Sequence, residues 1–381
     1  MTQLKEQLRF RKRLLRKIAL RTGAGSGEIG AALLETETRR YLHSHQVQCA
    51  ALYDIWCNDF GVNEALARWK SAQRQPLVPF DYRRFRALPV EWHNKPRRTS
   101  GYRKICRFQP LEKMWHVLAA DLIGAMHDPR PHIGDWRRRG RDQQMGRLLA
   151  LIGSPWQAVV AADIRCAFAR VNVDAVYDLL SLPEPLVRRA IDYRSHKFVR
   201  RERSVLAIPF DKVLQHDLEV APTGLMEGSP VSNAIFSVLM DDLPDHLGKE
   251  IEVFVYCDNI ILLAPSMLHA QRAENALVRY LTGHRAGPFE VRSEVHPITR
   301  PFEHLGYSIR LVDGVITVGL STSNWRRFGQ KLDDERVPLK EAIEWLSFSF
   351  PHVSEPDLVS LLLTVLDEAA HRDLKAEAAR R

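Results

Sequence analysis

Two apolar segments separated by a short polar interruption constrain this chain most. Residues 251–256 and 260–263 each have the length and composition of a buried β-strand, and Asp258 and Asn259 lie where the apolar pattern is interrupted. The pair therefore predicts a hairpin with polar residues at its tip. A third apolar run, residues 158–162, predicts another short buried strand.

Segments with helical spacing of apolar residues alternate with these strands. Four such segments are residues 173–180, 185–193, 231–243 and 268–281. Residues 289–295 and 305–318 are predicted to be extended, and helices return from residue 324 onward. This order of strands and helices favours an α+β fold in which helices back a sheet.

The first 72 residues are predicted to be helical, and they begin with a dense run of positive charge. Eight cationic side chains are opposed only by Glu6: Lys5, Arg9, Arg11, Lys12, Arg13, Arg16, Lys17 and Arg21. Leucine and isoleucine at helical spacing make this segment a basic amphipathic helix. Two interpretations stay open, namely an arm that binds phosphates and a solvated face of a helix packed on the protein body.

Composition narrows the class of protein. With 381 residues, of which 45% are hydrophobic and 27% charged, the chain can form two or three packed units. Its apolar runs are too short to cross a membrane, and no secretion signal is visible, so we expect no membrane partner. Five scattered cysteines favour a reducing, cytoplasmic compartment. The net charge of +9 favours nucleic acid as a partner, because arginine makes bidentate contacts with phosphates.

Three polar segments carry the residues that could perform chemistry. Asp163 follows the apolar run of residues 158–162, and Asp258 lies 95 positions further along the chain. Between them, residues 222–233 form a turn of small residues that leads into a helix and lets backbone approach a ligand. Each segment alone is typical of an ordinary turn or cap. Together, the two carboxylates can meet at adjacent strand ends, where they would hold Mg²⁺ ions that bridge substrate phosphates.

In this order, the segments resemble motifs of the reverse transcriptase family, particularly bacterial enzymes related to those of group II introns and retrons. Residues 163–168 resemble the motif Asp-x-x-x-x-aromatic, residues 227–233 the motif Gln-Gly-x-x-x-Ser-Pro, and residues 256–259 the motif Tyr-x-Asp-Asp. The Leu-Gly-Tyr sequence of residues 305–307 resembles the turn that grips the primer end.

Upstream segments extend the resemblance, which covers residues 90–310 with the motifs in the family's order. Lys95-Pro96 with residues 101–105 is similar to the fingers pattern Lys-Pro-x-Gly-x-x-Arg-Pro-Leu, and Gly140-Arg141 to a Gly-Arg-Ser segment before the palm. The resemblance implies a right-hand polymerase. Its expected parts are a basic helical extension at residues 1–80, fingers at 81–162, a palm at 163–318 with a fingers insertion at about 184–222, and a helical thumb at 319–381.

The resemblance also implies a role for each matching residue. Asp163 and Asp258 would bind two Mg²⁺ ions, with the carbonyl of Ile164 as a further ligand and Asn259 beside them. Phe168 would sit under the sugar of the incoming nucleotide and exclude a 2′-hydroxyl. The remaining roles are triphosphate binding by Lys95 and Arg103, contact with the template–nucleotide pair by Glu227 and Gly228, and the primer grip by Leu305, Gly306 and Tyr307.

Two positions depart from the family pattern. Asn259 stands where a second aspartate is usual, so the metal site has one negative charge less. Glu227 replaces the usual glutamine, and a carboxylate there repels a nucleic-acid backbone or reads base amino groups instead, which points to unusual or template-independent synthesis. The lysine expected after the hairpin is also missing, and Arg292 and His296 are the candidates to replace it.

The expected activity is RNA-directed DNA synthesis, in which a primer 3′-hydroxyl attacks the α-phosphate of a dNTP. The expected partners are an RNA template or a dedicated non-coding RNA, the DNA product, and a further copy of the chain or a partner reverse transcriptase. A stand-alone architecture, with no room for an endonuclease or ribonuclease H domain, resembles the antiphage-defence group. The alternative is a palm that has lost catalysis and serves as an RNA-binding or assembly subunit, and Phe168 disfavours RNA synthesis.

Overall fold

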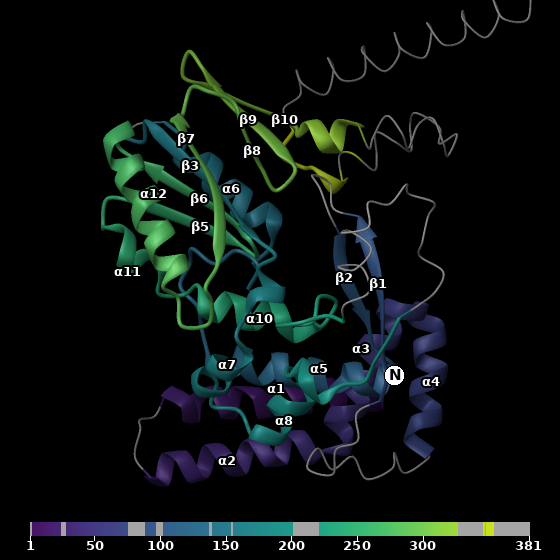
Figure 1. Ribbon diagram of the computed structural model, residues 1–381. Coiled ribbons are helices and arrows are strands. Elements are labelled where there is room, and N and C mark those ends of the chain that lie inside the picture. Colours follow the sequence, from purple (N-terminus) through teal and green to yellow (C-terminus); the bar gives the residue numbers. More distant parts are fainter. Residues whose placement is uncertain are drawn as a thin grey trace, which may run out of the picture. The chain divides into compact units, whose positions relative to one another are not determined.

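Helices and small sheets alternate along the chain, as the computed structural model in Figure 1 shows. The described residues are 2–23, 28–74, 88–96, 102–136, 139–153, 155–200, 221–326, 346 and 348–353. Within these ranges the mixture confirms the expected α+β class. Packing divides the chain into two units: unit 1 comprises Met1–Arg130, Cys166–Asp241 and Leu281–Phe289, and unit 2 comprises Pro131–Arg165, Asp242–Tyr280 and Glu290–Arg381.

Unit 1 begins with four helices, which confirms the predicted helical character of this region. They are α1 (Thr2–Gly23), α2 (Glu28–His43), α3 (His45–Phe60) and α4 (Val62–Arg74). The breaks around α3 follow ordinary capping rules. Its first turn is capped by the Ser44 side chain, and Gly61 ends it with a φ of +83°.

The buried side chain of Arg11 links α1 to the helices packed against it. Its guanidinium donates to the carboxylate of Asp54 at 2.7 Å and to that of Asp121 at 2.8 Å, and only 8% of the residue is exposed. Tyr41 donates to the same Asp121 carboxylate at 2.5 Å. Because a buried charge must be paired, this residue serves packing, and the phosphate-binding interpretation does not apply to Arg11.

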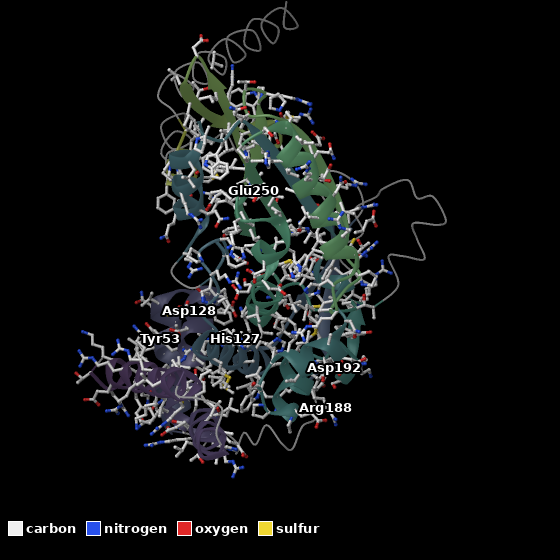
Figure 2. The ribbon with its side chains drawn as sticks, turned by 90° about the vertical axis from the view of Figure 1, so that its left-hand side faces the viewer. Tyr53, His127, Asp128, Arg188, Asp192 and Glu250 are labelled. Atoms are coloured by element: carbon white, nitrogen blue, oxygen red, sulfur yellow. The ribbon has the colours of Figure 1, made fainter. Side chains whose placement is uncertain are left out.

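The helix α5 (Pro110–Met126) is central to unit 1 and packs against α1, α3, α8 (Glu184–Ala190) and α10 (Pro230–Leu239). His127 and Asp128 follow its last residue (Figure 2). Beside it lies a small sheet in which β1 (Val90–Pro96) pairs antiparallel with β2 (Tyr102–Arg107) and parallel with β4 (Phe198–Arg200).

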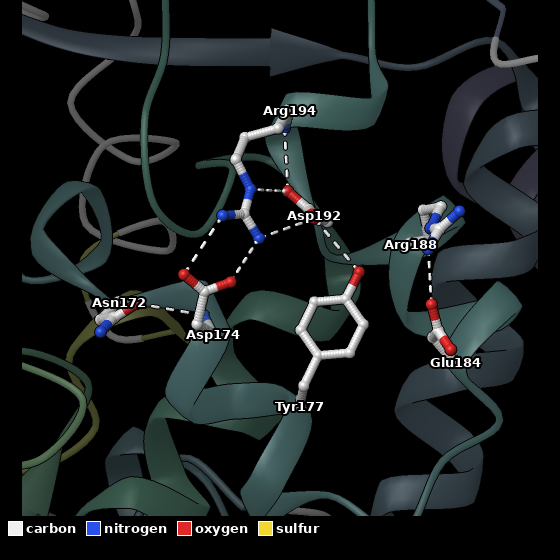
Figure 3. A network of polar contacts seen from close by, with 7 residues as sticks. All are labelled: Asn172, Asp174, Tyr177, Glu184, Arg188, Asp192 and Arg194. Carbon is white, nitrogen blue, oxygen red and sulfur yellow. Dashed lines mark hydrogen bonds and ion pairs between the residues drawn. The ribbon is translucent and has the colours of Figure 1, made fainter.

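After the 3-10 helix η1 (Phe168–Arg170), a polar network joins α7 (Val173–Leu179) to the 3-10 helix η2 (Tyr193–Ser195). Figure 3 shows Arg194 between the carboxylates of Asp174 and Asp192, at 2.7 Å and 2.9 Å. The Asp192 side chain also accepts from the Arg194 backbone N–H and begins η2. The helix predicted over residues 185–193 therefore ends at Ala190, and η2 takes its last part.

Unit 2 contains a four-stranded antiparallel sheet with the order β5 (Glu252–Tyr256), β6 (Asn259–Ala264), β3 (Ala158–Arg165), β7 (Glu290–Pro297). The helices α12 (Met267–Thr282) and α6 (Arg141–Leu151) lie on opposite faces of it (Figures 1 and 2). The predicted hairpin and the predicted strands at 158–162 and 289–295 are confirmed. The helix predicted over 231–243 instead ends at Leu239, and α11 (Leu243–Leu247) starts anew, with Pro244 in its first turn.

A second sheet of unit 2 consists of β8 (Phe302–His304), β9 (Tyr307–Val312) and β10 (Val315–Leu320). It shares an apolar core with α6 and one face of the first sheet, through residues such as Leu148, Phe254 and Ile309. No helix in the described ranges is long and apolar enough to cross a membrane. Several predictions fall outside the described residues: Gly101, residues 201–220 of the fingers insertion, and most of the thumb.

Candidate active site

Four side chains form a row across the end of the four-stranded sheet, and we call them the polar row: Tyr256, Asn259, Asp163 and Arg292. Each is the register partner of the next, on β5, β6, β3 and β7 respectively. Directly opposed residues of an antiparallel sheet project from the same face, so the row lies on one face. Asp163 is exposed between buried Ala162 and buried Ile164.

Asp258 lies beside this row in the turn between β5 and β6. Because Tyr256 pairs with Asn259, the turn consists of Cys257 and Asp258 alone. Cys257 has a φ of +50°, the left-handed conformation that two-residue hairpin turns require and side chains disfavour. The backbone N–H of Ile164 donates to the carbonyl of Asp258 at 2.9 Å. The two aspartates of the family motifs thus belong to neighbouring segments joined by a backbone hydrogen bond.

Asn259 is bonded to one of these aspartates. Its side-chain Nδ2 donates to Oδ1 of Asp258 at 2.9 Å. An aspartate in its place would offer no hydrogen and would repel the neighbouring carboxylate. The asparagine therefore allows its side chain to lie against the Asp258 carboxylate, but it carries no negative charge that could attract a cation.

The residues at this end of the sheet fit a magnesium site. Mg²⁺ is usually held by one or two carboxylates together with substrate phosphates and water, rather than by a full cage of protein ligands. Asp163, Asp258 and the amide oxygen of Asn259 are ligands of this kind. Among the described residues there is no group of three or more His, Cys, Asp or Glu side chains placed to hold a metal ion.

Of the two candidates for the missing lysine, Arg292 has the better place. It is exposed and directly opposite Asp163 in the polar row. His296 is instead opposite Val159 and is 3% exposed, with its ring against Phe302 at a centroid distance of 5.8 Å. Of the two side chains, Arg292 is therefore the one placed beside Asp163 and open to a ligand.

The predicted triphosphate-binding pair lies on the small sheet of unit 1. Lys95 of β1 and Arg103 of β2 are register partners, and both are exposed. Like charges directly opposite each other destabilise a sheet. Two exposed cations opposite each other on one sheet face are side chains of the kind that bind a phosphate.

The Glu227–Gly228 turn of unit 1 is fixed through its backbone. The carbonyl of Glu227 accepts from the N–H of Cys106 in β2 at 2.7 Å. Gly228 has a φ of +101°, and a Cβ there would lie 2.4 Å from the carbonyl oxygen of Cys106. Only glycine fits such a backbone approach.

Phe168 packs against the same turn. Its carbonyl accepts from the N–H of Leu225 at 2.8 Å, and its ring lies 5.4 Å from that of Phe236. A Cβ on Gly224, whose φ is +64°, would lie 2.3 Å from the Phe168 carbonyl oxygen. The structure thus brings the end of segment 163–168 into contact with the start of segment 222–233.

His116 is a residue that sequence analysis missed. It lies in α5 with no exposed surface, and its Nδ1 is 2.6 Å from the hydroxyl of Ser229, the N-cap residue of α10. Burial, reinforced by His196 and Arg189, lowers the pKa of His116 well below its ordinary value. A neutral imidazole therefore supports the Glu227–Gly228 turn from the protein interior. A single histidine in an apolar helix carries no sequence signal for this role.

The predicted primer grip is a two-residue turn between β8 and β9. Leu305 and Gly306 have φ values of +49° and +88°, as a type I′ turn requires. The Gly306 carbonyl accepts from the Ser321 N–H and from Nδ2 of Asn324, both at 2.9 Å. A left-handed leucine is strained and persists only where its surroundings hold it.

Tyr307 connects this turn to the Gly140-Arg141 segment within unit 2. The guanidinium of Arg141 lies 5.6 Å from the centre of the Tyr307 ring, and the Tyr307 hydroxyl is 3.4 Å from the Asp142 carboxylate. Burial raises the pKa of Tyr307 to about 12. Two segments of the family resemblance that are far apart in sequence are thus in contact.

A scan against protein-family models finds no match for this chain, and a search of curated proteins finds none either. The family resemblance therefore rests on the sequence motifs alone.

Proposed function

We propose that this protein is a Mg²⁺-dependent RNA-directed DNA polymerase of right-hand architecture. The observation that carries the proposal is the placement of Asp163 and Asp258 on adjacent segments, joined by the bond from the Ile164 N–H to the Asp258 carbonyl at 2.9 Å. Two carboxylates at one end of a sheet, with an arginine beside them, suit a substrate that carries metal-bound phosphates.

The chain's own residues would bind and orient the reactants. Asp163 and Asp258 would hold two Mg²⁺ ions, with the Ile164 carbonyl as a further ligand. Bound Mg²⁺ would activate the primer 3′-hydroxyl and stabilise the charge on the α-phosphate. Lys95 and Arg103 would bind the triphosphate, and the rigid backbone at Gly228 would lie against the template–nucleotide pair.

Several residues would set selectivity. The Phe168 ring, held by Phe236, would exclude a 2′-hydroxyl, and Leu305, Gly306 and Tyr307 would position the primer end. The RNA template, the dedicated non-coding RNA and a role in antiphage defence follow from the family resemblance alone. So does assembly with another copy or a partner reverse transcriptase.

One observation favours the second candidate function, a palm without catalysis that binds RNA. The Asn259 amide occupies one oxygen of Asp258, at 2.9 Å, that a metal ion would otherwise use. A catalytic metal site needs this amide to turn or to share that oxygen.

Incorporation of dNTPs on an RNA template with a DNA primer separates the two functions. Asp163→Asn and Asp258→Asn should each lower incorporation by about a thousandfold, because losing a metal-binding charge removes several kcal/mol of transition-state stabilisation. Both variants should keep the wild-type melting temperature.

Asp313→Asn is the matched control. Asp313 is an exposed aspartate in another hairpin turn of unit 2, with a φ of +50° like that of Cys257. Its substitution should leave incorporation unchanged. A wild-type protein that binds RNA but incorporates no dNTP on primed RNA or on copurified nucleic acid would reject the polymerase proposal and leave the RNA-binding one.

A further inference from the structure

We propose that the exposed face of α1 binds an RNA phosphate backbone, at a surface separate from the Glu227–Gly228 turn of the same unit. The face consists of Lys5, Arg9, Lys12, Arg13, Arg16, Lys17 and Arg21, all of which are exposed. The choice of RNA over DNA rests on the proposed function, whereas the binding of phosphates rests on the face itself.

The inward side of α1 fixes which cations face solvent. The buried residues of the helix recur at intervals of three and four and form one stripe: Leu4, Gln7, Arg11, Leu14 and Ile18. This stripe packs against α2, α3 and α5. This packing fixes the rotation of α1 about its own axis. The other cations of the helix therefore face away from α2, α3 and α5.

Four of the exposed cations form a stripe opposite the buried one. Lys5, Arg9, Lys12 and Arg16 are spaced at i, i+4, i+7 and i+11, which spans about 16 Å at the rise of an α-helix. Glu6 is the exposed acidic residue of α1. Within the part of the chain that the structure describes, Lys17 is the one member of the face with an acidic ion-pair partner, Glu37 at 4.0 Å.

This arrangement is unfavourable for the helix alone. Five pairs of cations stand four residues apart, from Lys5/Arg9 to Lys17/Arg21, and each such pair destabilises a helix by a few tenths of a kcal/mol. In α2, α4 and α8, by contrast, arginines are paired at the same spacing with glutamates. A bound polyanion would neutralise these cations and remove the repulsion between them, so the surface suits a polyanionic partner.

A groove beside the stripe adds features that suit nucleotides. It has a volume of about 440 Å³ and is lined by Arg9, Phe10 and Arg13 of α1 and by Gln46 of α3, together with Gln3, Glu6 and Gln7. The Arg13 guanidinium lies 5.3 Å from the centre of the Phe10 ring. Aromatic and guanidinium planes stack on bases, and a glutamine side chain can bond to base edges.

The same geometry disfavours a lipid surface. An amphipathic helix binds a bilayer by inserting its apolar face, and in α1 that face is buried against the rest of unit 1. The surface also differs from the Glu227–Gly228 turn within unit 1, because α5 packs against α1 and against α10, the helix that follows this turn (Figure 1). It would therefore hold a part of the RNA remote from that turn.

Salt-dependent binding tests the proposal with a fluorescein-labelled oligouridine of 20 nucleotides. The full chain carrying Asp163→Asn serves as background, so the result does not depend on polymerase activity. The test variant adds Lys5→Gln, Arg9→Gln and Arg16→Gln. The control variant adds Arg39→Gln, Arg68→Gln and Arg188→Gln, which remove the same charge from exposed, glutamate-paired arginines of unit 1.

The test variant should bind about tenfold or more weakly, and its log–log salt slope should fall by about 2, or about 0.7 for each lost single-strand contact. The control should change the slope by less than about 0.7. The test variant should melt at or slightly above the temperature of the background, because three repulsive pairs are removed, and the control at or slightly below it, because three ion pairs are lost. Equal slopes in the two variants would overturn the proposal. Binding of the same proteins to vesicles of phosphatidylserine and phosphatidylcholine is measured in parallel. The proposal would also be overturned if the test variant lost binding to these vesicles but not to the oligouridine. An equal loss for oligothymidine would overturn the choice of RNA.

Discussion

Units 1 and 2 hold their candidate functional residues in different ways. In unit 2, the chemistry depends on side chains, Asp163 and Asp258, that stand at the rim of a buried sheet and are exposed or half-buried. In unit 1, the Glu227–Gly228 turn is fixed by its backbone, with β2 on one side and buried His116 beneath Ser229. Substitution of Asp163 or Asp258 in unit 2 should therefore cost activity alone, whereas substitutions at the turn of unit 1 should also cost stability.

Gly228→Ala is the sharpest test of this difference. The added methyl would meet the Cys106 carbonyl oxygen at 2.4 Å, in addition to the strain of a φ of +101°. We expect the free energy of unfolding to fall by about 3 kcal/mol or more, and incorporation to fall with it. Urea unfolding at neutral pH measures the loss.

Gly61→Ala is the matched control, since Gly61 has a φ of +83° but no atom within 4 Å of an added Cβ. It should lose only the conformational part, about 1 to 2 kcal/mol. Equal losses in the two variants would show that β2 yields to the methyl group and that the turn is not rigid.

Phe168→Ala should change sugar selectivity more than stability. Removing the ring opens the space that a 2′-hydroxyl would need, so the ratio of rNTP to dNTP incorporation should rise by about tenfold to a hundredfold. Phe236→Leu removes the ring that Phe168 packs on, at 5.4 Å, and should leave the ratio within about threefold. A ratio unchanged by Phe168→Ala would make Phe168 an ordinary packing residue.

Acid should destabilise both units through buried histidines. Burial lowers the pKa of His196 in unit 1 to about 4 and that of His304 in unit 2 to about 3. Since the unfolded chain takes up these protons near pH 6.5, stability is present above that pH and should fall below it, by about 1.4 kcal/mol per pH unit for each histidine. The raised pKa values of Asp54 and Glu112, caused by burial, act in the opposite direction.

A neutral substitution isolates one histidine from these opposing groups. His304→Gln should flatten the dependence of unfolding free energy on pH, between pH 6 and 4, by about 1.4 kcal/mol per pH unit. Unfolding of wild type and variant at three pH values gives the difference. If unfolding free energy depends on pH equally in wild type and variant, His304 binds its proton as readily in the folded protein as in the unfolded chain.

The sequence predicts what depends on local pattern and misses what depends on pairing across the chain. The hairpin of β5 and β6 follows from two apolar runs, and the inward position of Arg11 could have been found from the phase of Leu4, Leu14 and Ile18 on α1. The opposition of Lys95 and Arg103, however, depends on the register of two strands. The contact of His116 with Ser229 joins residues 113 positions apart and leaves no periodic trace.

Asn259→Asp should have the smallest effect, and it tests how far the site in unit 2 depends on charge alone. Nδ2 of Asn259 donates to Oδ1 of Asp258 at 2.9 Å, so an aspartate here replaces a hydrogen bond by repulsion between carboxylates. In EDTA the variant should lose about 1 kcal/mol of stability, and Mg²⁺ should restore it by neutralising both charges.

The same repulsion should strengthen metal binding. Asn259→Asp should keep polymerisation and reach half-maximal incorporation at a Mg²⁺ concentration about threefold or more below that of wild type, because each added ligand charge favours the bound cation. Asn259→Ala removes a neutral ligand and should cost less activity than Asp258→Ala, which removes a charged one. Titrating Mg²⁺ against incorporation and melting temperature for all four proteins measures both effects. If Asn259→Asp needs more Mg²⁺ than wild type, the amide itself is a required part of the site, and the bond to Asp258 orients that carboxylate instead of competing with the metal.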